Sequence, residues 1–142
     1  MLLLPTVGSP WYAGRMEFFE DLDIRNATCP PAAASPRNLT VYRLVDTIPM
    51  KVEDIWSYRA LYPAKIFPGV DECMARACSV FADCGDLKKI RKMPKFKMKK
   101  IVAIDIETRD GVLLKTFAGS HFSWWISRGF NLTAVAVAKE AV

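Results

Sequence analysis

Residues 100–127 read KIVAIDIETRDGVLLKTFAGSHFSWWIS, and this stretch decides the fold class. It contains three segments rich in β-branched and aromatic residues, at Lys100–Ile106, 112–117 and 121–127. Asp110-Gly111 tolerates the positive φ angles of a tight hairpin turn, and Ala118-Gly119-Ser120 predicts a second turn. Three strands therefore follow one another without a helix between them. Because the first strand is apolar on both faces, we expect it to be central and buried.

Upstream of this stretch, strand and helix signals alternate. The expected elements are a strand at Leu39–Val45, a helix at 47–61, a short helix at 71–77, a strand at Cys78–Phe81 and a helix from the cap Asp83 to Pro94. A last strand is expected at 133–138. This order predicts an α+β fold with a small, mixed but mostly antiparallel sheet that ends in a strand meander.

The distribution of prolines divides the chain into an N-terminal arm, residues 1–38, and a single domain, residues 39–142. The arm contains five prolines and no sustained hydrophobic period, although one short helix is expected at 16–22. Its aromatic residues make it too apolar for an idle tail; they are Trp11, Tyr12, Phe18 and Phe19. We therefore expect the arm to wrap the domain or to reach a partner.

Composition and cysteine content limit the class of protein. A chain of 142 residues with 51% hydrophobic residues has the size and apolar content of one globular core. No run approaches the roughly 18 apolar residues that span a bilayer, and the first residues lack a secretion leader, so a cytoplasmic protein without a membrane partner is expected. The four cysteines are then expected to be reduced. Their spacing does not match a zinc site, and no metal is expected.

Arg43 is the most informative polar residue of the first strand. A period of two places it on the same face as the apolar Val41 and Val45. A buried guanidinium needs an anionic partner or several acceptors. In the alternative interpretation the other face of the strand is the inner one, or the strand lies at an edge and Arg43 extends into water.

Three segments in this order resemble the ADP-ribosyltransferase-like superfamily and the related RES-type NAD-degrading toxins. The segments are Val41-Tyr42-Arg43-Leu44, Cys78-Ser79-Val80-Phe81-Ala82-Asp83 and Lys100–Ile106. The resemblance implies a small domain that binds NAD as its substrate and either transfers ADP-ribose or hydrolyses the nicotinamide bond. It also implies a protein partner, either a target or an antitoxin.

Site residues follow from the resemblance. Arg43, with Tyr42 beside it, would contact the nicotinamide-side ribose or the phosphates, and Ser79 would support the ribose. The catalytic glutamate of the superfamily would be Glu140, with Glu107 and Asp105 as alternatives. The chain lacks the Glu-x-Glu or Gln-x-Glu pair that usually carries this glutamate, so the match covers the first two roles only.

The segment 121–127 carries a second group of polar residues. Alternation places His121, Ser123, Trp125 and Ser127 on one face, and Phe122, Trp124 and Ile126 on the other. The first face is either a pocket wall, with Trp125 stacked on a ligand ring and Ser123 fixing its orientation, or an exposed sheet face with a packed tryptophan. His121 is the only histidine and therefore the candidate acid or base.

The net charge of +5 is concentrated in one segment. Residues 88–100 contain eight basic residues and no acidic one, so the rest of the chain sums to −3. We call these eight residues the basic surface: Lys88, Lys89, Arg91, Lys92, Lys95, Lys97, Lys99 and Lys100. They predict either a site for nucleic acid or an acidic protein, or a solvated face that binds nothing. A non-enzymatic interaction module is therefore the alternative to the NAD hypothesis.

Overall fold

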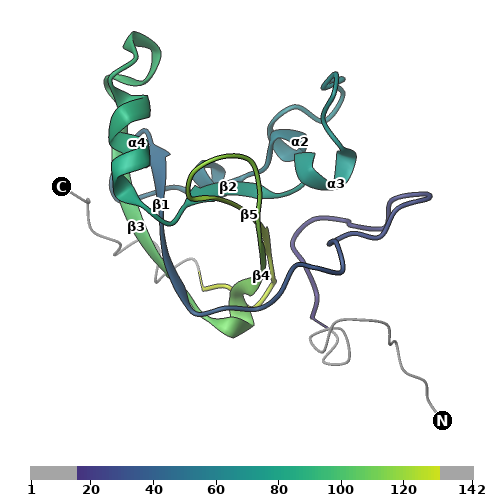
Figure 1. Ribbon diagram of the computed structural model, residues 1–142. Coiled ribbons are helices and arrows are strands. Elements are labelled where there is room, and N and C mark those ends of the chain that lie inside the picture. Colours follow the sequence, from purple (N-terminus) through teal and green to yellow (C-terminus); the bar gives the residue numbers. More distant parts are fainter. Residues whose placement is uncertain (1–15, 132–142) are drawn as a thin grey trace.

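The computed structural model of the protein describes residues 16–131 and contains one antiparallel sheet with short helices around it (Figure 1). The strands are β1 (Leu39–Val45), β2 (Cys78–Phe81), β3 (Lys100–Ile106), β4 (Gly111–Lys115) and β5 (His121–Ile126). The helices are α2 (Tyr58–Leu61), α3 (Glu72–Ala75) and α4 (Cys84–Arg91), and the 3₁₀ turns are η1 (Val52–Ile55), η2 (Pro94–Phe96) and η3 (Thr108–Asp110). The predicted α+β class is confirmed. The strand expected at 133–138, and Glu140, lie outside the described residues.

The five strands pair in the order β3-β1-β2-β5-β4, and every pairing is antiparallel. β1 and β3 pair along their full length, from Leu39 opposite Ile106 to Val45 opposite Lys100. β4 and β5 form a hairpin through the turn that was predicted at 118–120. By contrast, β1 and β2 meet at a single register pair, Tyr42 opposite Phe81.

The hairpin expected between β3 and β4 is wrong, because these strands lie at opposite edges of the sheet. Asp110 does not enter a hairpin turn. Its carboxylate accepts a hydrogen bond from the Glu107 backbone N–H (2.7 Å) and closes the turn η3. β3 is consequently an edge strand and not a central one. It is still buried on both faces, since Ile101 and Val102 are 0% exposed.

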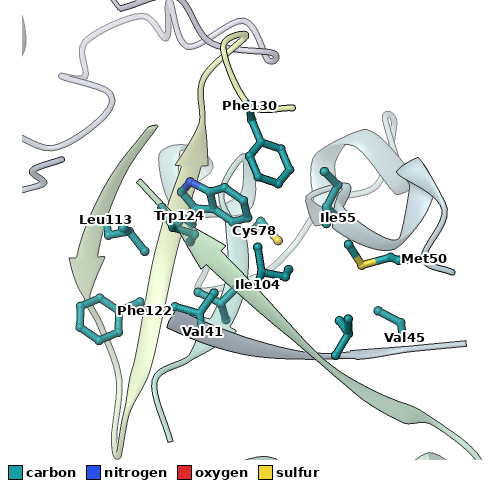
Figure 2. Close-up of a cluster of buried hydrophobic side chains, with 13 residues drawn as sticks. Val41, Val45, Met50, Ile55, Cys78, Ile104, Leu113, Phe122, Trp124 and Phe130 are labelled. Carbon is teal, nitrogen blue, oxygen red and sulfur yellow. The ribbon is translucent and has the colours of Figure 1, made fainter. Parts of the chain in front are cut away.

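The sheet must curl to allow this connection. Strands at opposite edges of a flat five-stranded sheet lie about 19 Å apart. The link from Ile106 to Gly111 reaches at most about 17 Å when extended, and the turn η3 shortens it further. Figure 1 accordingly shows the strands curving around a central space, and Figure 2 shows the apolar side chains that fill it, with Trp124 in the middle.

The opposite face of the sheet is covered by α4 on one side and by the N-terminal arm on the other. The arm bridges to the sheet where Ser35 pairs with Leu113 and where Phe18 pairs with Ser127. A second apolar cluster fills the space beneath it; its buried members are Ala34, Cys73, Ala77, Val112 and Trp125. The described part of the arm therefore wraps the domain. The helix expected at 16–22 is wrong, because this segment is extended and pairs with the end of β5.

A disulfide joins Cys29 of the arm to Cys73 of α3. The expectation of four reduced cysteines is therefore wrong for these two, while Cys78 and Cys84 are free. The sequence did not reveal the pair because the two residues are 44 positions apart and meet only when the arm folds back. Of the helices in residues 16–131, none is long and apolar enough to cross a membrane.

The helix expected at 47–61 is divided into η1 and α2. Ser57 separates them in an extended conformation, and its hydroxyl accepts a hydrogen bond from the Ala60 N–H (3.0 Å) as the cap of α2. The apolar residues of this segment are consequently divided between two elements. Ile55 is buried, whereas Trp56 and Tyr58 are 40% and 59% exposed.

Candidate functional site

Arg43 lies on the core side of β1 and is half-buried. Its Nε donates to the Asp54 carbonyl and its Nη1 to the Ser79 carbonyl, both at 2.5 Å. β1 and β2 pair only at Tyr42 and Phe81, so the Ser79 carbonyl has no partner in the pairing of these two strands. The Arg43 guanidinium donates to that carbonyl instead. Arg43 thus contacts Ser79 only through the Ser79 backbone carbonyl, and not through its hydroxyl. The several acceptors that a half-buried guanidinium needs are thus the backbone carbonyls of Asp54 and Ser79.

Ser79, Ser123 and His121 lie on the same face of the sheet. Ser79 is opposite Ser123 in the β2–β5 register. The Thr116 hydroxyl lies 2.9 Å from the His121 Nδ1 and 2.9 Å from the Ser123 Oγ. Phe81 and Phe117 flank the imidazole with ring centroids 5.1 and 5.0 Å away. Burial of the ring lowers the pKa of His121 below its ordinary value, because desolvation disfavours the charged imidazolium.

The alternation predicted for β5 is confirmed, but its polar face is neither an open pocket wall nor an exposed sheet surface. His121, Ser123 and Trp125 are 7%, 3% and 1% exposed. The Trp125 indole N–H donates to the Cys73 carbonyl (3.0 Å), beneath the arm and α3. The proposed ligand-stacking face of Trp125 is therefore covered by the protein itself over most of its area.

A cavity of about 240 Å³ lies between the arm and the segment η1–α2. Its lining is mostly apolar and includes Phe18, Phe19, Leu22, Val52, Ile55, Trp56, Ala60, Cys78, Trp125 and Ile126. Glu20 is its acidic group, and burial raises the pKa of this carboxyl although hydrogen bonding to Ser57 acts in the opposite direction. The cavity is smaller than the roughly 300–1,000 Å³ of pockets for drug-sized ligands. Arg43, Ser79 and His121 are not among its lining residues.

The basic surface lies on α4, on the turn that follows it and on Lys100 at the start of β3. As predicted, Asp83 caps this helix by accepting a hydrogen bond from Gly85 N–H (2.9 Å), and the regular helix ends before Pro94. The first turn is fixed to the β4–β5 loop, because the Ser120 N–H and hydroxyl both donate to Asp86 (3.0 and 2.8 Å). Leu87 packs into the domain and is 2% exposed. The helix is thus anchored at its base, while its far end projects beyond the sheet (Figure 1).

The cations of the basic surface are largely unneutralised. Lys99 forms an ion pair with Asp46 (2.5 Å). Within residues 16–131 the other seven cations have no ion pair with a carboxylate. Six of the eight are exposed, and Arg91 and Lys99 are half-buried. Because Lys and Arg occupy the last turn of α4, they also interact favourably with the negative end of the helix dipole.

A third feature was not found from the sequence. Arg59 of α2 donates from Nε and Nη2 to both carboxylate oxygens of Glu72. Its Nη1 donates to three carbonyls of the following loop, those of Tyr62, Pro63 and Lys65. Carbonyl acceptors have no signature in a sequence, so only the Arg and Glu side chains could have suggested the pair. We call the loop between α2 and α3, residues 62–71, the apolar tip, because Ile66 in it is 82% exposed.

No group of three or more His, Cys, Asp or Glu side chains in residues 16–131 could hold a metal ion. Comparison of the chain with protein-family models, curated proteins and solved structures gave no match. The choice between functions therefore depends on the geometry of the residues. Ser79, Ser123 and His121 share one face of the sheet, whereas the Arg43 side chain lies on the opposite, core face, so these residues do not converge on one cleft. The basic surface, by contrast, presents seven cations that have no carboxylate partner within residues 16–131.

Proposed function

We propose that the protein is a non-enzymatic interaction module that binds a polyanionic partner through the basic surface. The observation that carries this proposal is the set of seven cations on and after α4 that have no carboxylate partner in the described part of the chain. Seven like charges in 13 consecutive positions repel one another. A partner with closely spaced negative charges relieves this repulsion and releases its own counterions.

The surroundings of the basic surface support the same function. The base of α4 is fixed by Asp86 and Ser120, so the cations are presented by a rigid support. Lysines outnumber arginines by seven to one among the eight residues of the basic surface, and lysine acts as a compact point charge that does not need bidentate acceptors. Electrostatic attraction to an array of phosphates or carboxylates fits this composition better than recognition of one planar group.

Inorganic polyphosphate is a suitable first probe because it presents negative charge without bases or apolar groups. We expect binding by calorimetry that weakens steeply with salt. The double variant Lys95→Glu/Lys97→Glu should bind at least tenfold more weakly, with a salt slope smaller by about 2, since about one counterion is released per contact. The control Arg25→Glu/Lys51→Glu makes the same change in net charge at two exposed residues elsewhere. Equal weakening by both pairs, or by neither, contradicts the proposal.

NAD turnover is a second candidate with one observation in its favour, the contact between Arg43 and Ser79. Two further observations weigh against it. Two nitrogens of the Arg43 guanidinium are already bonded to backbone carbonyls, and His121 and Ser123 are buried. Because Arg43→Ala would also remove structural bonds, the wild-type chain gives the cleaner test. A folded sample that releases no nicotinamide from NAD, and takes up no NAD in calorimetry, excludes this candidate.

A further inference from the structure

The apolar tip is a rigid loop that presents aliphatic and aromatic side chains to solvent. Ile66, Tyr62 and Val70 are 82%, 49% and 46% exposed. Three carbonyl bonds from Arg59 hold the loop, and Phe67 packs with its ring centroid 5.0 Å from the Arg59 guanidinium. Exposed apolar side chains on a preorganised loop are characteristic of a binding surface, because ordering them at the moment of binding costs little.

The turn after α4 also presents apolar side chains to solvent. Met98 and Met93 are 86% and 48% exposed, and they lie among the lysines of the basic surface. Lys65 likewise lies within the apolar tip, with its Nζ 5.2 Å from the centre of the Tyr62 ring. Both segments therefore combine cations with unburied apolar side chains.

The two segments point to the same side of the molecule. In Figure 1 the turn after α4 and the loop between α2 and α3 are the two projections at the top, and the sheet lies below both. A flat surface laid across the top can touch both projections without meeting the sheet. The spacing of the two projections thus suits an extended planar partner.

We propose that this partner is the surface of an anionic lipid bilayer, which the protein meets with the basic surface and the apolar tip together. This inference rests on the proposed function, because anionic headgroups are the polyanion that the lysines would contact. Lysines near an anionic membrane are attracted to its surface potential. Tyr62, Ile66 and Met98 enter the boundary between headgroups and acyl chains, where convex apolar projections need no complementary pocket.

Other polyanions fit the same observations less well. A nucleic acid backbone offers phosphates to the lysines but gains nothing from burying Ile66 or Met98. An acidic protein would need two separate recesses, one for each projection. The membrane expectation from sequence was negative because no segment spans a bilayer, and binding at the surface requires no such segment.

Sedimentation with lipid vesicles tests the inference. We expect binding to vesicles of phosphatidylcholine with 30% phosphatidylserine, roughly the anionic content that gives an appreciable surface potential, and no binding to pure phosphatidylcholine. The variant Ile66→Ser/Met98→Ser should weaken vesicle binding by about tenfold or more and leave polyphosphate affinity unchanged. The control Phe117→Ser changes a residue that is 76% exposed outside both projections, and it should bind as the wild type does.

The outcomes separate the two proposals. If Lys95→Glu/Lys97→Glu affects neither polyphosphate nor vesicle binding, the proposed function itself fails. If the lysine variant weakens both while Ile66→Ser/Met98→Ser changes neither, polyanion binding stands and the bilayer inference is overturned. Binding of a DNA duplex with no binding of anionic vesicles also overturns it and identifies a nucleic acid as the partner.

Discussion

Arg59 binds the carboxylate of Glu72 in a bidentate pair, with Nε 2.8 Å from Oε2 and Nη2 2.9 Å from Oε1. Because its third nitrogen donates to carbonyls of the apolar tip, one side chain joins α2 to α3 and also fixes the loop between them. Arg76 also donates to Glu72, from Nε at 2.9 Å. The loop that carries Ile66 is thus ordered by a small network of charges together with the packing of Phe67 on Arg59, while Ile66 itself stays exposed.

Replacing Arg59 by lysine is expected to loosen the apolar tip without unfolding the domain. An ammonium group is a single point and cannot hold both carboxylate oxygens and three carbonyls at once. Amide hydrogen exchange in residues 62–71 should accelerate by about tenfold or more, while exchange in β1 and β3 stays slow. Arg25→Lys is the matched control on an exposed arginine of the arm. Unchanged exchange in 62–71 would show that the loop does not depend on this network.

The same network predicts that the order of the apolar tip depends on pH. Hydrogen bonds from Arg59 and Arg76 lower the pKa of Glu72 to about 2. A depressed carboxyl pKa stabilises the folded form above the unfolded value, near 4.5, and this stabilisation is lost as pH falls from about 4.5 towards 2. Exchange in the apolar tip should therefore accelerate over that range. Glu72→Gln should remove this pH response, and a carboxyl resonance of Glu72 that titrates near 4.5 would contradict the assignment.

The disulfide between Cys29 and Cys73 is expected to be the main covalent constraint on the arm. Cys73→Ser removes a closed loop of 44 residues, and loop-closure entropy alone then predicts a loss of about 4 kcal/mol in the free energy of unfolding. Guanidinium denaturation measures this loss, and reduction of the wild type should reproduce it. Cys84→Ser is the control, since Cys84 is free. Four alkylated thiols in the unreduced, denatured chain would show that the bond does not form.

The sequence predicted individual elements better than their partners. β1, β2 and β3 have the expected bounds because β-branched runs depend on local side-chain preferences. The neighbours of β3 could not be predicted in this way. Asp110-Gly111 has the composition of a hairpin turn, yet the Asp110 carboxylate bonds the Glu107 N–H, and β3 pairs instead with β1. An apolar run on both faces indicated burial, and β3 is buried on both faces although it lies at the edge of the sheet.

The candidate sites show the same limit. The basic surface was evident because like charges in one segment need no folding information to be recognised. The face on which Arg43 lies followed from period two. Its acceptors, the carbonyls of Asp54 and Ser79, are brought to it only by the tertiary fold. The role of Arg59 was missed for the same reason. A side chain whose partners are backbone atoms leaves no pattern in residue types.

His121 gives a direct measure of how tightly the polar face of β5 is closed. Burial lowers the pKa of its imidazole below the ordinary value of 6.5. The neutral ring is favoured in the folded state, so its contribution to stability is complete above about 6.5 and declines as pH falls below that value. As the only histidine, it should give one set of imidazole signals in an NMR titration, with a midpoint below 6.5. A midpoint at or above 6.5 would mean that water reaches this face.

A substitution at Gly111 distinguishes the observed connection between β3 and β4 from the hairpin turn that Asp110-Gly111 suggests. Its φ is +135°, and a Cβ there would lie 2.2 Å from the Trp125 carbonyl and 2.9 Å from the Trp124 Nε1. Gly111→Ala must therefore displace β5 or break the bond from the Trp124 indole to the Asp110 carbonyl.

Gly69 is the matched control, because its φ is +73° but a Cβ there meets nothing within 4 Å. Gly69→Ala should lower the free energy of unfolding by about 1–2 kcal/mol, the backbone strain alone, and Gly111→Ala by at least about twice as much, since steric overlap is added. Denaturant unfolding of the two variants measures the difference. If Gly111 lay in an ordinary hairpin turn, it would need only a positive φ, and Gly111→Ala would lower the free energy of unfolding by as much as Gly69→Ala. Equal losses would therefore mean that β4 and β5 do not approach each other as closely as described.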